Sequence, residues 1–158
     1  MLENLITDRT QADFERWRTL RDKGYAKMTA EEKAEFSEDM KGAYNASDLN
    51  RVGEALNYLR DRLTAAGYLF GNEFAAREDW AENEIPTAEQ FTAYLKAVEV
   101  IRAAMSRYST TPATPADDGG LDIQGANDIE SILLDVDELI NKMRAARYFL
   151  NDLYSGEI

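Results

Sequence analysis

Residues 49–66, LNRVGEALNYLRDRLTAA, carry the pattern that decides the fold. Apolar residues recur at gaps of three and four, at Leu49, Val52, Leu56, Leu59, Leu63 and Ala66. This spacing keeps one apolar stripe on a single face of an α-helix, where it can pack against a partner helix. Capping residues precede the stripe at Asn45-Ala46-Ser47-Asp48, and Gly67 follows it as the expected C-terminal cap. The stretch therefore predicts a long core helix of about 30 Å.

The same spacing returns in two later segments. One starts at the capping box Thr87-Ala88-Glu89-Gln90 and continues to Tyr108. The other is expected at 123–149. Its stripe consists of Ile129, Ile132, Val136, Leu139, Met143 and Ala146. Two shorter helices are expected earlier, at about 10–23 and after the capping box Thr29-Ala30-Glu31-Glu32. No segment has convincing strand alternation, so the chain is predicted to be all-α, with a bundle of three long helices preceded by two shorter ones.

A length of 158 residues fits one domain with a real core, and we predict a single helical domain over 1–158. The expected parts are short helices at 1–44, a helical hairpin at 45–108, a flexible linker at 109–122, a long helix at 123–149 and a tail at 150–158. The linker contains two of the three prolines of the chain. Within the hairpin, residues 68–86 lack helical period and predict an ordered, irregular aromatic loop that folds back over the helices.

Charge and composition exclude several classes of function. The chain has 18 Lys and Arg against 30 Asp and Glu, a formal charge of −12, which disfavours nucleic acid and anionic membrane surfaces as partners. It has no Cys and no His, which removes disulfides, thiolate nucleophiles and imidazole metal ligands. No apolar run approaches the roughly 18 residues of a membrane span, so we expect no membrane insertion.

Carboxylates are the remaining route to acid–base or metal chemistry. The acids of 31–39 lie on the helix face opposite Phe36 and Met40, which is typical of a solvated surface. The acids of 128–138 lack the His that a ferritin-like metal site requires. No glycine-rich phosphate-binding loop occurs. The sequence therefore predicts a non-enzymatic protein without catalytic, cofactor-binding or metal-binding residues.

Three aromatic residues of the irregular loop are candidate interaction residues. Tyr68, Phe70 and Trp80 can line a sugar or peptide site, or they can close the open end of the bundle by packing. The packing interpretation is favoured, and the ligand site remains an alternative.

Four further residues are candidates for interaction or helix register. Asn50 and Asn127 lie beside the apolar stripes, where a buried amide can fix the register between helices. Their equivalent places in two helices are compatible with a weak internal duplication. Tyr44 precedes a helix cap, and Tyr154 belongs to a tail that can dock on a neighbouring chain or fray.

A family resemblance extends over most of the chain. The residues that carry it are NLITDRTQAD at 4–13, KGAYN at 41–45, DLNRV at 48–52, GY at 67–68, Trp80, IPT at 85–87, ANDIE at 126–130 and YSGE at 154–157. Together they resemble small uncharacterised helical proteins from tail-gene regions of phages and prophages of Gram-positive bacteria. The pattern differs at Gly53, where a larger residue is usual. A mid-helix glycine costs about 1 kcal/mol relative to alanine, so a close contact or a bend is expected there.

The resemblance implies a virion component of the tail tip, baseplate or fibre attachment. Such a protein would be made in the host cytoplasm and then assembled into the virion, with other tail proteins and copies of itself as partners. The resemblance assigns no functional residue.

Two alternatives remain from other classes. The charge of −12 suggests an acidic DNA mimic that inhibits a host nucleic-acid enzyme, although acids alternate with bases in Arg60-Asp61-Arg62. The loop aromatics suggest a glycan-binding receptor module.

Overall fold

The computed structural model describes residues 2–37, 40–71, 74, 76–117 and 120–155, with side chains described as far as Arg147. Its α-helices are α1 (Gln11–Lys23), α2 (Ala30–Ser37), α3 (Ala46–Ala65), α4 (Ala88–Ala103) and α5 (Ile123–Ser155). Short 3-10 turns occur at Leu2–Asn4 and Tyr25–Lys27. Every regular element in the described ranges is a helix, so the all-α prediction is confirmed.

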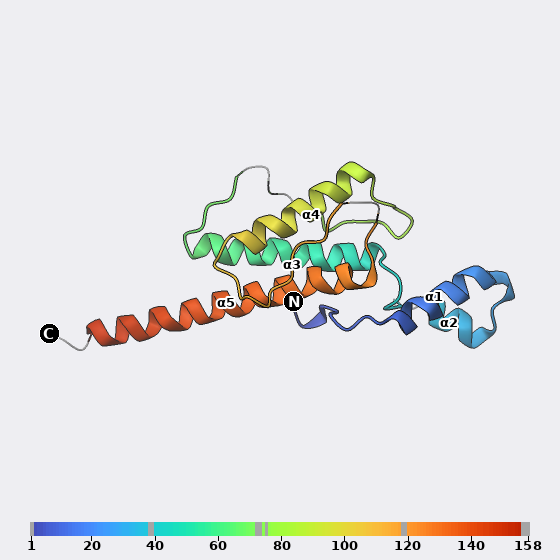
Figure 1. Ribbon diagram of the computed structural model, residues 1–158, viewed down its shortest axis with the longest axis horizontal. Coiled ribbons are helices and arrows are strands. Elements are labelled where there is room, and N and C mark those ends of the chain that lie inside the picture. Colours follow the sequence, from blue (N-terminus) through green and yellow to red (C-terminus); the bar gives the residue numbers. More distant parts are fainter. Residues whose placement is uncertain (1, 38–39, 72–73, 75, 118–119, 156–158) are drawn as a thin grey trace.

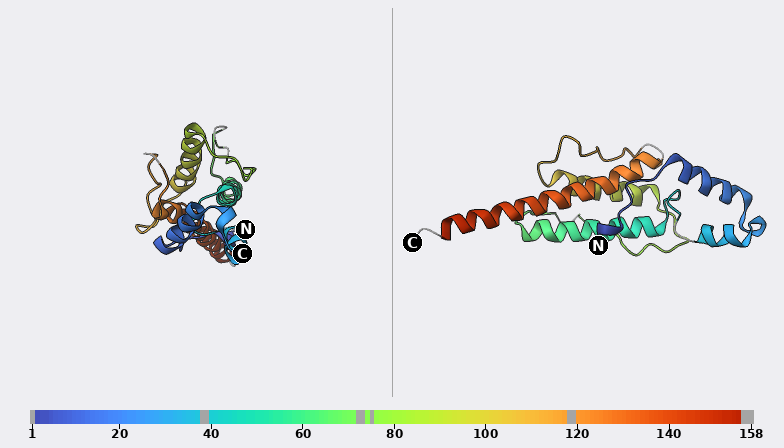
Figure 2. Two further views of the ribbon diagram at one scale, coloured as in Figure 1. Left: turned by 90° about the vertical axis from the view of Figure 1, so that its right-hand side faces the viewer. Right: turned by 90° about the horizontal axis from the view of Figure 1, so that it is seen from below.

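The molecule is elongated around a core of three helices. α3, α4 and α5 contact one another pairwise, and α1 and α2 form a hairpin beyond one end of this core (Figure 1). The last turns of α5 extend past the opposite end, as the view from below shows (Figure 2, right). The N-terminal segment that leads into α1 runs along the core. No described helix has the length and the apolar composition needed to cross a membrane.

The predicted apolar stripe of α3 and parts of those of α4 and α5 form the core. Of the stripe expected on α5, Leu139 and Met143 are half-buried and Ala146 is exposed, because the end of this helix runs past the core. Val52, Leu56, Leu59 and Leu63 of α3 are fully buried, as expected from their spacing. They pack with apolar residues of the two other core helices. These are Tyr94, Leu95, Ala97, Val98 and Ile101 of α4, and Ile129, Ile132, Leu133, Val136 and Ile140 of α5. Burial of apolar surface stabilises a fold by about 25 cal/mol per Å², so this cluster is the main source of stability.

Helix starts coincide with the predicted capping residues. Thr10 and Asp13 cap each other at α1, Asn45 and Asp48 do so at α3, and Thr87 with Gln90 does so at α4. Each cap satisfies backbone N–H groups that a helix start leaves free. These interactions span three residues, which is why the sequence alone predicts them.

Helix ends differ from the expected ones in two places. α4 ends at Ala103 and not near Tyr108, because the chain turns back toward α5 through a turn in which the N–H of Thr111 donates to the carbonyl of Tyr108 at 3.2 Å. α5 continues to Ser155, past the predicted end at residue 149. Residues 150–155 contain no Gly or Pro that would stop a helix, so the segment expected as a tail is largely helical.

The segment 109–122, expected to be a flexible linker, is irregular in its described part and is hydrogen-bonded to the core. Thr111 is buried, and its hydroxyl donates to Asp135 at 2.6 Å. Arg102 donates from Nε to the carbonyl of Pro112 at 2.6 Å. These bonds link the described part of the segment to both α4 and α5.

Candidate functional site

Four charged side chains form a buried ion-pair cluster where the N-terminal segment crosses α3 and α5. They are Arg9, Asp48 and Arg51 of α3, and Glu130 of α5. The Glu130 side chain is fully buried, and its Oε1 accepts from Nη2 of Arg9 at 2.6 Å and of Arg51 at 2.8 Å. Its Oε2 accepts from the N–H of Ile6 at 2.6 Å and from Nε of Arg51 at 3.1 Å. Two positive and two negative groups make the cluster formally neutral, which is the condition under which buried charges are tolerated.

Asp48 has two structural roles at once. One carboxylate oxygen accepts from Nη2 of Arg9 at 2.7 Å and also from Arg51. The other accepts from the backbone N–H of Asn45 at 2.9 Å and so completes the cap of α3. The start of α3 is therefore tied directly to the N-terminal segment.

Asn127 holds the same segment through its backbone. Its Oδ1 accepts from the N–H of Arg9 at 3.0 Å, and its Nδ2 donates to the carbonyl of Arg9 at 2.9 Å. The amide was expected to fix the register between helices. It instead satisfies both backbone groups of one non-helical residue, because Arg9 lies in an extended stretch that has no helical hydrogen-bond partners.

Asn50 makes the equivalent pair of bonds to the irregular loop. Its Oδ1 accepts from the N–H of Trp80 at 2.7 Å, and its Nδ2 donates to the carbonyl of Trp80 at 3.0 Å. Two turns further along α3, Asn57 donates to the carbonyl of Ala76 at 2.9 Å. The loop residues 76–80 are thus held against α3 by two amides on one helix face.

Gly53 lies between these two amides and allows the loop backbone to approach. A Cβ atom placed on it would lie 2.0 Å from the carbonyl oxygen of Arg77. The Arg77 guanidinium carbon lies 4.1 Å from the Trp80 ring centroid, and its nitrogens donate to Asp79 at 2.6 Å and Glu84 at 2.7 Å. These hydrogen bonds to Arg77 lower the pKa of both carboxyl groups. The close contact expected at Gly53 is therefore with the loop and not with another helix.

The loop aromatics are covered to different degrees. Trp80 is buried, with Arg77 against its ring, whereas Tyr68 and Phe70 are half-buried against the core. Phe70 lies 5.7 Å from Phe74 in a tilted ring pair, and the Tyr68 hydroxyl donates to the sulfur of Met143 at 3.9 Å. This packing resembles the covering of a core more closely than an open sugar site.

Tyr44 and Tyr94 join the turn before α3 to α4. Their hydroxyl groups hydrogen-bond to each other, and the Arg9 guanidinium carbon lies 5.5 Å from the Tyr44 ring centroid. Burial of the hydroxyl groups raises the pKa of Tyr44 and of Tyr94 well above the ordinary tyrosine value. Both therefore stay protonated near neutral pH and act as hydrogen-bonding groups.

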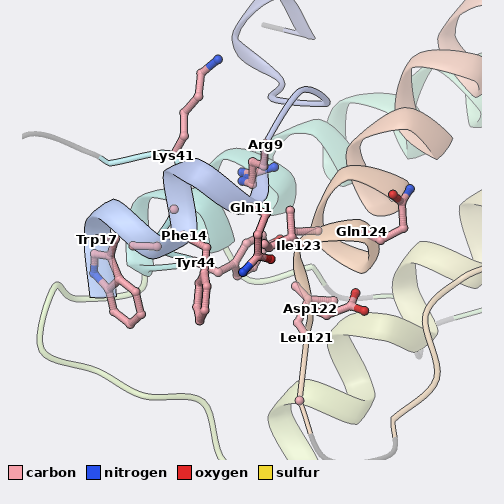
Figure 3. Close-up of a pocket in the computed structure, with 14 residues that line it drawn as sticks. Arg9, Gln11, Phe14, Trp17, Lys41, Tyr44, Leu121, Asp122, Ile123 and Gln124 are labelled. Atoms are coloured by element: carbon pink, nitrogen blue, oxygen red, sulfur yellow. The ribbon is translucent and has the colours of Figure 1, made fainter. Parts of the chain in front are cut away.

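A cleft of about 820 Å³ opens beside these residues, between α1, the 41–44 turn and the start of α5 (Figure 3). Its walls are mainly apolar and include Phe14, Trp17, Tyr44, Leu121 and Ile123. Two cations line it. Arg9 is bound by the buried cluster, and Lys41 donates to Asp8 at 2.7 Å. The cleft thus combines apolar walls with cations that already have partners.

The last candidate, Tyr154, is in the final turns of α5, where side chains lie outside the described residues. The structure therefore brings Tyr44 and Asn127 together around Arg9, and Asn50 together with Trp80 in the loop. Tyr68 and Phe70 lie elsewhere, toward the end of the core from which α5 projects.

The sequence pattern missed the charged cluster. Its only signal is Glu130, which directly follows Ile129 of the apolar stripe on α5 and is itself fully buried. Arg9 precedes the first helix and gives no periodic signal. In the described residues, no group of three or more carboxylates, Cys or His could hold a metal ion. The buried carboxylates Asp48 and Glu130 are bound by arginines, so the arrangement fixes segments of the chain in place.

Comparison with known proteins gives no relative from which a role can be read. No family model, no curated protein and no solved structure matches this chain.

Proposed function

We propose that the chain is a non-enzymatic structural or adaptor protein that works through protein–protein contacts. Following the resemblance of its sequence, we place it in a phage tail, at the tip, baseplate or fibre attachment. In this proposal it is made in the host cytoplasm, enters the virion, and has other tail proteins and copies of itself as partners.

The observation that carries the proposal is the shape of the molecule. α5 has 33 residues and runs past the core at one end, while the α1–α2 hairpin stands beyond the other end (Figure 1). In this proposal, these two extensions are the parts that contact neighbouring proteins. In this proposal, the bundle of three long helices with its irregular aromatic loop is the rigid body that carries these extensions.

The internal chemistry is also that of a scaffold. Buried polar groups such as Glu130 and Asn127 bind backbone or arginines within the chain, which favours a single well-defined arrangement. Such groups position elements and leave no reactive atom free.

The two alternative functions gain less from the structure. A DNA mimic needs free carboxylates in rows, whereas Glu35, Glu84 and Asp137 each pair with an arginine. A glycan site on Trp80 needs an accessible ring, whereas this ring is buried and Arg77 lies against it.

Quantitative mass spectrometry of purified virions tests the proposal. We expect the chain in the tail fraction at a fixed ratio to other tail proteins. A phage lacking the gene should produce particles with an incomplete tail, restored by the wild-type chain. Intact, infectious particles without the chain would overturn the proposal.

A further inference from the structure

We propose that the last turns of α5 from one copy dock in the cleft between α1 and the start of α5 of a second copy. This inference deepens the proposed structural role and rests on it. It names the occupant of the cleft as a second copy of this chain.

The donor segment is the end of α5, which projects from the core. After Met143, the side chains of Arg144, Ala145, Ala146 and Arg147 are all exposed. The helix continues to Ser155, about 18 Å beyond Met143 at 1.5 Å per residue. The sequence of these last turns, YFLNDLYS at 148–155, is mainly aromatic and aliphatic. A helix of this composition is normally covered by a partner.

The charge of α5 changes sign along its length. Residues 123–138 contain five acidic residues and no basic ones, whereas 139–155 contain three basic residues and one acidic one. Lys142 pairs with Glu138 at 2.8 Å, but Arg144 and Arg147 form no ion pair among the described side chains. The projecting end is therefore a basic segment of a protein whose net charge is −12.

The acceptor is the cleft at the opposite end of the molecule. Phe14 and Trp17 of α1 form one wall, with ring centroids 5.8 Å apart, and Leu121 lies across from them (Figure 3). Asp122 lines the cleft and Asp128 lies in the second turn of α5, with no ion pair to either among the described side chains. An apolar helix bearing arginines matches the apolar walls beside Asp122, because the two cations that line the cleft, Arg9 and Lys41, already pair with carboxylates.

The contact has to form between two molecules. Ile123 and Gln124, at the start of α5, line the cleft, and the projecting end belongs to the same continuous helix. That helix is about 50 Å long, so its end cannot return to its own start. The two surfaces are different, so the association is either reciprocal, which makes a symmetric dimer, or head-to-tail along a series of copies.

Cysteine cross-linking tests the contact in the full-length protein, which has no Cys of its own. Ala145→Cys places a thiol on the projecting end, and Gln124→Cys places one at the cleft. We expect a disulfide-linked dimer when the two variants are mixed under mild oxidation, and little product from either variant alone. The matched control is Ala103→Cys, on the exposed face at the end of α4 away from the cleft. Equal cross-linking of Ala145→Cys with this control would overturn the proposal.

Charge reversal gives a second, independent measurement. Arg144→Glu with Arg147→Glu should raise the dissociation constant of self-association in sedimentation equilibrium by about tenfold or more. Asp128→Lys should do the same, and a mixture of the two reversed proteins should regain affinity. Circular dichroism checks that each variant is folded. A wild-type chain that stays monomeric at every concentration overturns this inference, even where virions contain the chain. Self-association by a chain absent from virions would instead overturn only the phage-tail role.

Discussion

At the scale of single residues, two asparagines make the same pair of hydrogen bonds at different places in the fold. Asn127 holds Arg9 and Asn50 holds Trp80, each through both backbone groups of one residue outside the helices. The sequence identified both amides as important. It could not identify their partners, because a bond between residues 118 positions apart leaves no local pattern.

Gly53→Ala should destabilise the protein although alanine is the better helix former. Replacing a glycine inside a helix by alanine normally raises the free energy of unfolding by about 1 kcal/mol. Here its Cβ would overlap the Arg77 carbonyl, which belongs to backbone and cannot swing away. We expect the free energy of unfolding, measured in urea, to fall by about 1–3 kcal/mol. Glu54→Ala, at the exposed neighbouring position, is the control and should change stability by less than about 0.5 kcal/mol. Stabilisation by Gly53→Ala would contradict the close approach of the loop.

Asn127→Ala should loosen the N-terminal segment before it affects the whole fold. It removes two hydrogen bonds and leaves two buried backbone groups of Arg9 without partners, at a cost of about 2–4 kcal/mol. Limited trypsin digestion should then cut after Arg9 faster than in the wild type. Asn141→Ala, on the exposed part of the same helix, provides the comparison. Equal cleavage rates in the two variants would show that the amide does not hold the segment.

At the scale of elements, the starts of α1, α3 and α4 were predictable and several ends were not. A capping box such as Thr87 with Gln90 is a local interaction, readable from adjacent letters. The end of α4 instead depends on how the chain returns to α5, through contacts such as that of Thr111 with Asp135. The buried cluster was missed for the same reason, because Arg9 and Glu130 meet only once the elements have packed.

The buried cluster should behave as a unit in a double-mutant cycle. Arg9→Met alone leaves an uncompensated negative charge among Asp48, Arg51 and Glu130, and should cost about 3–5 kcal/mol. Glu130→Leu alone leaves an excess positive charge, with a similar cost. The double variant restores neutrality, so its loss should be clearly smaller than the sum of the two. Chemical unfolding of the three variants measures this, and simple additivity would contradict the proposed coupling.

At the scale of the whole molecule, an elongated body carries its ionisable groups in two settings. Many acids lie at the surface, where bonds to neighbouring groups lower their pKa. These are Asp8, Asp13, Glu32, Glu35, Asp79 and Glu84. The tyrosine pair of Tyr44 and Tyr94 lies inside, where burial raises the pKa.

Stability should fall on the acid side below about pH 4. The lowered carboxyl pKa values mean that the unfolded chain takes up protons before the folded one, so acid favours unfolding. Their stabilising effect is complete above the unfolded pKa and is lost as the pH drops through the folded pKa. Thermal unfolding over a pH series measures how steeply the melting temperature falls as the pH is lowered. Asp13→Asn should make this fall less steep. A melting temperature that stays level down to pH 3 would contradict this assignment.

Stability should also fall on the alkaline side, above about pH 10. A raised tyrosine pKa leaves the folded pair protonated while the same groups ionise in the unfolded chain. Phenolate absorbance should therefore show Tyr44 and Tyr94 titrating only as the protein unfolds. The double variant Tyr44→Phe with Tyr94→Phe should remove the rise in phenolate absorbance that accompanies unfolding. Titration of all tyrosines before the protein unfolds would argue against the buried pair.

The bond between Arg9 and Glu130 also imposes an order on biosynthesis. The two residues are 121 positions apart, so at about 5–20 residues per second the ribosome needs roughly 6–24 s to deliver the second after the first. The contact of Asn50 with Trp80 can form well before then. The segment around Arg9 is thus synthesised well before the partner that locks it in place. A ribosome stalled before residue 130 would carry a nascent chain whose N-terminal segment is still free.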